Sequence, residues 1–198
     1  AEYGQKLMTK PQIISADSHV QEPPELYAKW VPSKYRDKTP RVEERDGGRY
    51  MIVDGKRPRR LDIAYAGVTE DDETREFRSD DEGGRNLDRR LKDLERDGVS
   101  AEIIYPNSSL ALFNSDDSGY QLAVAQAYND WCIDLFGSHG DRFTPVGIVP
   151  VRDIDLAVKE VERIARLGYR SIKVPISVRA RPYNLPDYDP LWSAINDA

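Results

Sequence analysis

Four short apolar runs alternate with helical patterns along this chain, and the alternation is the feature that most constrains the fold. The runs begin at Ile13 and cover residues 101–105, 145–149 and 171–174. Strands that are apolar on both faces and separated by helices are typical of parallel sheets covered by helices. Two α/β architectures fit, an open doubly wound sheet and part of a (β/α)8 barrel. No GxGxxG follows the first run, so the main signal for a dinucleotide-binding sheet is missing.

The predicted helices have recognisable start and stop signals. In the first, Asn86 is a suitable N-cap, Leu87, Leu91 and Leu94 recur at helical spacing, and Gly98 is a suitable stop. Further helices are expected over residues 121–136, 154–167 and 190–198, and Asp153 is a suitable N-cap for the second of these. The 198 residues are therefore expected to form one domain with four βα units.

The first apolar run is expected to be a buried strand, and it ends in polar residues. Alternate side chains of a strand share a face, so Asp17 and His19 should point the same way, and Glu22 follows just beyond. Carboxylate and imidazole groups are ligands for divalent cations. Taken alone, the same residues are also compatible with a hydrogen-bonded start of a loop.

Composition excludes several classes of function. The net charge is -6 with acidic and basic residues mixed, which argues against nucleic-acid binding. The single cysteine, Cys132, excludes an intrachain disulfide framework and lies on a helical apolar stripe, so it is expected in the core. No apolar stretch is long enough to cross a membrane, and we expect a cytoplasmic protein.

Five motifs resemble, in their order, the amidohydrolase-2 family, the ACMSD-like metal-dependent hydrolases and decarboxylases. The first is DxHxxE, formed by Asp17, His19 and Glu22 and followed by PPELY. The others are DGVSAEIIYPN at residues 97–107, AYNDWCIDLF at 127–136, DRFTPVGIVPVRD at 141–153 and YDPLWSAIND at 188–197. The resemblance covers most of the chain apart from residues 41–84.

The resemblance favours the TIM-type (β/α)8 barrel over the open sheet. A complete barrel needs about 250 residues, so this chain is expected to supply about the first four βα units, the N-terminal half. Residues 25–84 would be an insertion between the first strand and its helix, a candidate lid, with a strand over residues 50–53 and a turn at Asp54-Gly55. Association with the missing half-barrel, or with further copies as a homo-oligomer, is expected to cover the open edges.

The resemblance also implies one divalent metal ion. Where family members have two histidines on the first strand, both bind the metal; Asp17 occupies the first of these positions and His19 the second. A carboxylate in the first position shifts the preference from zinc toward manganese or magnesium, although zinc remains compatible. Glu22 is expected either to bind the metal or to support the ligands that do. Further ligands, a histidine and an aspartate, would come from later strands, and the acid/base residue is not assigned.

Three residues after or within the later strands are candidate substrate contacts. Asn107 and Ser108 follow the second strand, and the alternative is that they only form a turn there. Lys173 is expected to point into the barrel from the fourth strand. A salt-bridged or carboxylated lysine is the alternative for Lys173. The other histidine, His139, precedes the third strand, opposite the catalytic face, and is expected to be structural.

These features indicate a metal-dependent hydrolase acting on a small carboxylate-bearing organic molecule. A decarboxylase of the same family is the alternative, because a metal ion can activate water or hold a carboxylate while carbon dioxide leaves. A non-catalytic half-barrel that serves in binding or assembly is the second alternative.

Overall fold

The computed structural model describes residues 12–23, 25–53, 57–60, 84, 86–176 and 181–198. Its main strands are all parallel. β1 pairs with β5 and β5 with β6; after Val146, the same chain segment continues as β7, which pairs with β8. Their bounds are β1 Ile13–His19, β5 Val99–Tyr105, β6 Phe143–Pro145, β7 Gly147–Ile148 and β8 Ile172–Lys173.

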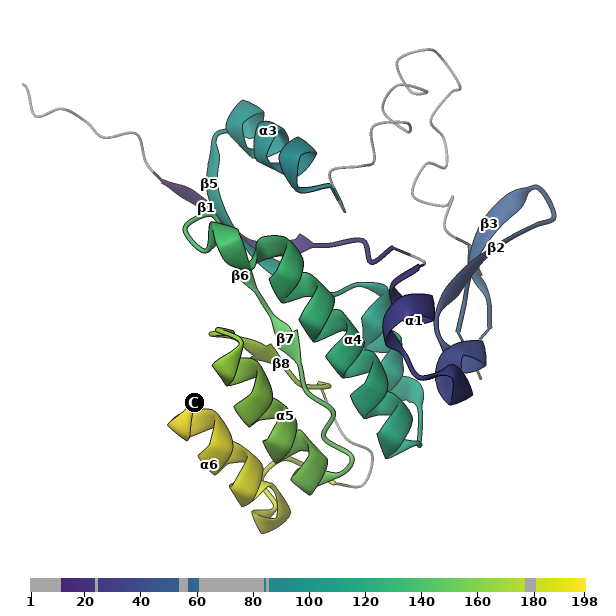
Figure 1. Ribbon diagram of the computed structural model, residues 1–198, viewed down its shortest axis with the longest axis vertical. Coiled ribbons are helices and arrows are strands. Elements are labelled where there is room, and N and C mark those ends of the chain that lie inside the picture. The colour runs from purple at the N-terminus through teal and green to yellow at the C-terminus, as the bar shows by residue number, and fades with distance from the viewer. Residues whose placement is uncertain (1–11, 24, 54–56, 61–83, 85, 177–180) are drawn as a thin grey trace, which may run out of the picture.

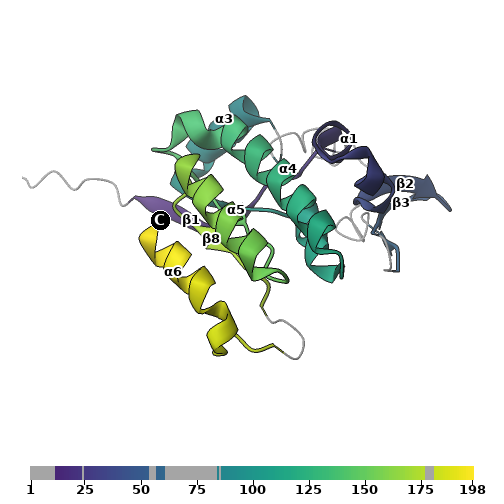
Figure 2. The same cartoon turned by 60° about the horizontal axis from the view of Figure 1, so that its bottom comes forward.

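Helices separate consecutive parallel strands, as the sequence predicts. They are α3 Leu87–Asp97, α4 Ser118–Phe136, α5 Ile154–Arg166 and α6 Asp189–Asp197. Helices α4, α5 and α6 lie side by side against the strands (Figures 1 and 2). Parallel strands with alternating helices in this order confirm the prediction of a partial (β/α)8 barrel.

The expected helix signals function as caps. The Asn86 side chain accepts a hydrogen bond from the Arg89 N–H, and Gly98 ends α3 in the left-handed conformation with φ 71°. Asp153 accepts from the Leu156 N–H at the start of α5. Helix α4 begins three residues before the predicted start at 121, because Asp117 caps it.

The core forms two clusters on the helix side of the strands. One surrounds α4, and the other lies between α5, α6, β8 and the segment that follows β7. Close packing at Gly147 shows how tightly α5 approaches, since a Cβ there would lie 2.8 Å from Cδ1 of Ile164. Cys132 is buried, as predicted.

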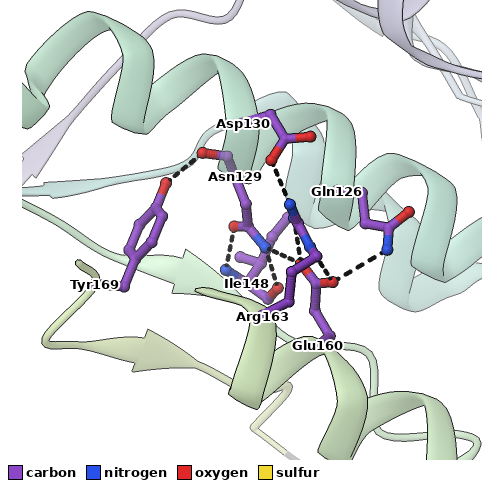
Figure 3. A network of polar contacts seen from close by, with 7 residues as sticks. All are labelled: Gln126, Asn129, Asp130, Ile148, Glu160, Arg163 and Tyr169. Carbon is purple, nitrogen blue, oxygen red and sulfur yellow. Dashed lines mark hydrogen bonds and ion pairs between the residues drawn. The ribbon is translucent and has the colours of Figure 1, made fainter. Parts of the chain in front are cut away.

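A polar network joins α4 to β7 and α5 within this packing (Figure 3). The Asn129 side chain donates to the Ile148 carbonyl and accepts from the Ile148 N–H. The Asn129 side chain also donates to the buried carboxylate of Glu160, and this carboxylate accepts another hydrogen bond from Arg163. The network therefore provides hydrogen-bond partners both for the backbone of β7 and for the buried carboxylate.

The expectation that the first strand is buried is wrong for the described part of the chain. The Ile13 and Ile14 side chains are 52% and 59% exposed. The physical reason is that β1 is an edge strand, paired with β5 alone among the described residues. Its apolar sequence predicts a covered strand, but the described residues do not cover it.

The insertion after β1 contains two short helical segments and an antiparallel sheet. They are α1 Glu25–Trp30, η1 Ser33–Lys38, β2 Arg41–Arg45, β3 Gly48–Ile52 and β4 Arg59–Arg60. The strand predicted over residues 50–53 overlaps β3, and the β2–β3 turn is Asp46-Gly47, both with positive φ. The predicted turn at Asp54-Gly55 and most of the acidic part of the predicted lid lie outside the described residues. The lid stays a prediction.

Across the described residues, no helix has the length and apolar character needed to cross a membrane.

Candidate metal site

The candidate site lies where β1 and β5 end. His19 and Tyr105 are partners in the parallel ladder, and the Val20 N–H donates to the Tyr105 carbonyl. Because parallel strands end at the same edge of a sheet, the polar residues after both strands meet there.

Asp17 and His19 share a face of β1, as predicted. Oδ1 of Asp17 lies 3.7 Å from Nε2 of His19, and the two side chains are 90% and 48% exposed. The β1–β5 register shifts between Ser15 and Ser18, so β1 bulges just before the site. The arrangement presents a carboxylate oxygen and an imidazole nitrogen side by side.

A hydrogen bond fixes which nitrogen of His19 faces Asp17. Nδ1 lies 2.9 Å from the Pro106 carbonyl oxygen. A carbonyl only accepts, so Nδ1 carries the hydrogen and Nε2 is left to bind a cation. Ligand histidines in metal sites are typically held through their other nitrogen in this way. The two side chains therefore fit a divalent metal ion.

The backbone of His19 is held as well. Nη1 of Arg90 donates to the His19 carbonyl at 3.1 Å, and Nε of Arg90 donates to Glu102 at 2.6 Å. Glu102 also accepts from the Ser18 hydroxyl at 2.7 Å. This nearly buried group of residues ties α3, β5 and the end of β1 together.

Arg90 and Glu102 were not predicted as site residues, although the sequence contains a signal for them. Arg90 lies between Leu87 and Leu94 on the apolar stripe of α3, and Glu102 interrupts the apolar run 101–105. A charged residue in each of two adjacent buried elements indicates a buried ion pair.

Glu22 follows β1, and its side chain lies against the loop after β5. Its Oε1 accepts from the N–H groups of Asn107 and Ser109, and its Oε2 accepts from the N–H and hydroxyl of Ser108. Each oxygen thus already accepts two hydrogen bonds. Of the two expected roles, the geometry favours support of the site over direct metal binding.

The three candidate substrate residues differ in their exposure and contacts. Asn107 is exposed and Ser108 is bonded to Glu22. Lys173 points away from Ile172 and Val174, which pack in the core, and its Nζ lies 5.8 Å from the Tyr105 ring centroid. The Tyr105 and His19 rings are 5.9 Å apart. Tyr105, which the sequence did not single out, therefore connects Lys173 with His19.

His139 and Cys132 lie apart from this site. His139 precedes β6, at the opposite ends of the strands, and its Nδ1 contacts the Ser138 hydroxyl. Burial raises the pKa of Cys132 to about 12, so its thiol stays protonated and a weak nucleophile. Within the described residues, no three or more histidine, cysteine or acidic side chains form a metal-binding group. Asp17 and His19 are a pair of ligands rather than a full set.

Comparison with known proteins gives one family match. The family model Amidohydro_2, described as amidohydrolase, matches residues 16–198. No curated protein matches the sequence.

Solved structures of similar fold include an amidohydrolase from Mycobacterium avium subsp. paratuberculosis, with a TM-score of 0.70 and 16% identity over 96% of this chain and 57% of that one. A 5-carboxyvanillate decarboxylase from Novosphingobium aromaticivorans with bound manganese has a TM-score of 0.57 and 19% identity over 94% and 48%. A dihydroxybenzoic acid decarboxylase from Polaromonas, with bound manganese and 2-nitroresorcinol, has a TM-score of 0.53 and 19% identity over 94% and 46%. The chain spans about half the length of these proteins.

Proposed function

Because the chain belongs to the amidohydrolase family, we propose that Asp17 and His19 hold a divalent metal ion for a reaction of a small carboxylate-bearing molecule. The observation that carries the proposal is the pairing of the Asp17 carboxylate with Nε2 of His19 while Nδ1 is bound to Pro106. Manganese is the proposed metal, since two decarboxylases of similar fold were crystallised with it. A carboxylate ligand suits this ion.

Lys173 supplies the proposed contact for the substrate carboxylate. It is half-buried, lies on the same side of the strands as His19, and makes no ion pair with a described residue. A half-buried ammonium group with no acidic partner among the described residues favours an anion. The Tyr105 ring, between Lys173 and His19, would pack against an apolar or aromatic part of the substrate.

Decarboxylation is the reaction we favour. A bound metal ion supplies positive charge that stabilises electrons left behind when carbon dioxide departs. Lys173 would hold the carboxylate that leaves, Tyr105 would pack against the apolar part of the substrate, and Asp17 and His19 would hold the metal ion. The carbon–carboxylate bond would break, carbon dioxide would leave, the bonding electron pair would stay on the substrate carbon, and that carbon would take up a proton from water.

Hydrolysis is the second candidate, because the family match itself carries the description amidohydrolase. Both reactions use the same ligand pair, so the products decide between them. A non-catalytic role in assembly is the third. The edge of β1 that no described strand pairs with favours pairing with another chain or another part of a longer one.

Incubation of the manganese-loaded protein with hydroxybenzoates tests the proposal, with released carbon dioxide as the measurement. We expect activity in the wild type and a rise in KM of about tenfold or more in Lys173→Met, since an ion-paired contact contributes about 1.5–3 kcal/mol. Lys159→Met, which replaces an exposed lysine of α5, is the matched control and should change little.

Ester and amide substrates in the same assay separate hydrolysis from decarboxylation. Hydrolysis of these compounds without carbon dioxide release would favour the second candidate. Absence of both activities in a protein that binds manganese would favour the assembly role.

A further inference from the structure

We propose that Glu22 is a positioning residue for His19. It holds the loop after β5 so that the Pro106 carbonyl fixes the imidazole with Nε2 toward the metal. The inference rests on the proposed function for the presence of the metal, and it deepens that function by assigning a role to the last residue of the DxHxxE motif.

The first observation is the number of donors on Glu22. Three consecutive N–H groups, of Asn107, Ser108 and Ser109, point at one carboxylate, joined by the Ser108 hydroxyl. The four distances are 2.9–3.0 Å. Hydrogen bonds to a charged acceptor are about twice as strong as neutral ones. The loop conformation is therefore tied to the charge of Glu22.

The second observation is that Glu22 and His19 hold the same peptide group. The Pro106 carbonyl accepts from Nδ1 of His19, and the N–H of the same peptide, on Asn107, donates to Oε1 of Glu22. The described peptide bonds are trans, so this planar unit has its carbonyl and N–H on opposite sides. Rotation of the unit would break both bonds at once.

Tyr27 supports the same loop from α1. Its hydroxyl lies 2.9 Å from the Ser108 hydroxyl and 3.0 Å from the Ser109 hydroxyl. Burial and the neighbouring Glu22 charge raise the pKa of Tyr27, so the hydroxyl keeps its hydrogen. The segment DxHxxEPPELY thus places the proposed ligands and the residues that orient them within one stretch of chain.

The substitution Glu22→Gln isolates this role. A glutamine keeps the size of the side chain, but its NH2 group replaces one of the two carboxylate oxygens. That NH2 group then faces N–H or O–H donors instead of accepting from them. Two acceptor sites and the negative charge are lost. The peptide between Pro106 and Asn107 should then be free to rotate, and the His19 ring should lose its single orientation.

Two measurements on the full chain test the proposal. Long-range proton–nitrogen NMR reports the tautomer of each imidazole, and the sequence has only two histidines, so His139→Gln assigns the spectrum. We expect His19 to be the Nδ1–H tautomer in the wild type and a mixture in Glu22→Gln. The Kd for Mn²⁺ should rise by about 10–100-fold. Glu162→Gln, on the exposed face of α5, is the matched control and should alter neither quantity.

A folded Glu22→Gln protein with His19 still in one tautomer and Mn²⁺ affinity within about twofold of wild type would overturn the proposal. If this variant does not fold, Glu22→Asp decides by the same readouts. Aspartate keeps the charge, but its side chain is shorter by one methylene, so we expect an intermediate effect. Wild-type values of both quantities in this variant would contradict the role. A wild type that binds no Mn²⁺ contradicts the proposed function, whereas the NMR result still decides whether Glu22 positions His19.

Discussion

At the residue scale, the Asn129 side chain ties α4 to the backbone of β7. Its buried side-chain amide bonds both the N–H and the carbonyl of Ile148 and reaches Glu160 on α5 (Figure 3). The hydrogen bond from the Tyr169 hydroxyl to the Asn129 carbonyl extends the contact to the segment before β8. One residue therefore joins three elements.

We predict that Asn129→Ala lowers the free energy of unfolding by about 3 kcal/mol, because it leaves two buried backbone groups and part of the Glu160 carboxylate unpaired. Urea unfolding followed by circular dichroism measures the change. Asn196→Ala, on the exposed side of α6, should stay within about 0.5 kcal/mol of wild type. Equal effects of the two substitutions would contradict the assigned role.

At the scale of elements, the contact of α3 with the end of β1 holds the candidate site in place. Arg90 and Glu102 have side chains only 10% and 9% exposed, and Arg90 also holds the His19 carbonyl. A buried pair that loses one member leaves the other charge uncompensated. The geometry of the candidate site therefore depends on a helix that contributes no ligand.

We predict that Arg90→Met destabilises the protein by about 3 kcal/mol or more, since Glu102 remains buried without its ion pair. Thermal and urea unfolding measure this effect. Arg96→Met removes an exposed arginine of the same helix and should have little effect. A wild-type stability in Arg90→Met would show that the ion pair is not needed to hold β1.

Elements with local signals were predictable from the sequence. Caps such as Asn86 and Asp153 and the stop at Gly98 depend on neighbouring residues, and the structure confirms them. The exposure of β1 was not predictable in this way, because an apolar sequence does not identify the neighbour that covers a strand. The Asp46-Gly47 turn was not predicted, and the predicted turn at Asp54-Gly55 lies outside the described residues.

The candidate site was predictable only in part for the same reason. Strand alternation alone places Asp17 and His19 on one face. The contacts of Glu22 and Tyr105 join residues more than 80 positions apart, which no local pattern encodes. The carboxylate of Glu22 has the chemistry of a metal ligand, and only its four donors indicate the supporting role.

At the scale of the whole molecule, the chain contains parallel strands β1, β5, β6–β7 and β8 of a barrel and spans about half the length of solved proteins of similar fold. Asp17, His19, Tyr105 and Lys173 lie toward one side of these strands. We propose that this side binds a metal ion through the end of β1.

Calorimetric titration with Mn²⁺ of wild type, His19→Ala and His139→Ala tests whether the ion binds at this position. We predict one Mn²⁺ per chain in the wild type, affinity weaker by at least about 100-fold in His19→Ala, and unchanged affinity in His139→Ala, because only His19 adjoins Asp17. Wild-type affinity in His19→Ala, or equal losses from both substitutions, would contradict the claim.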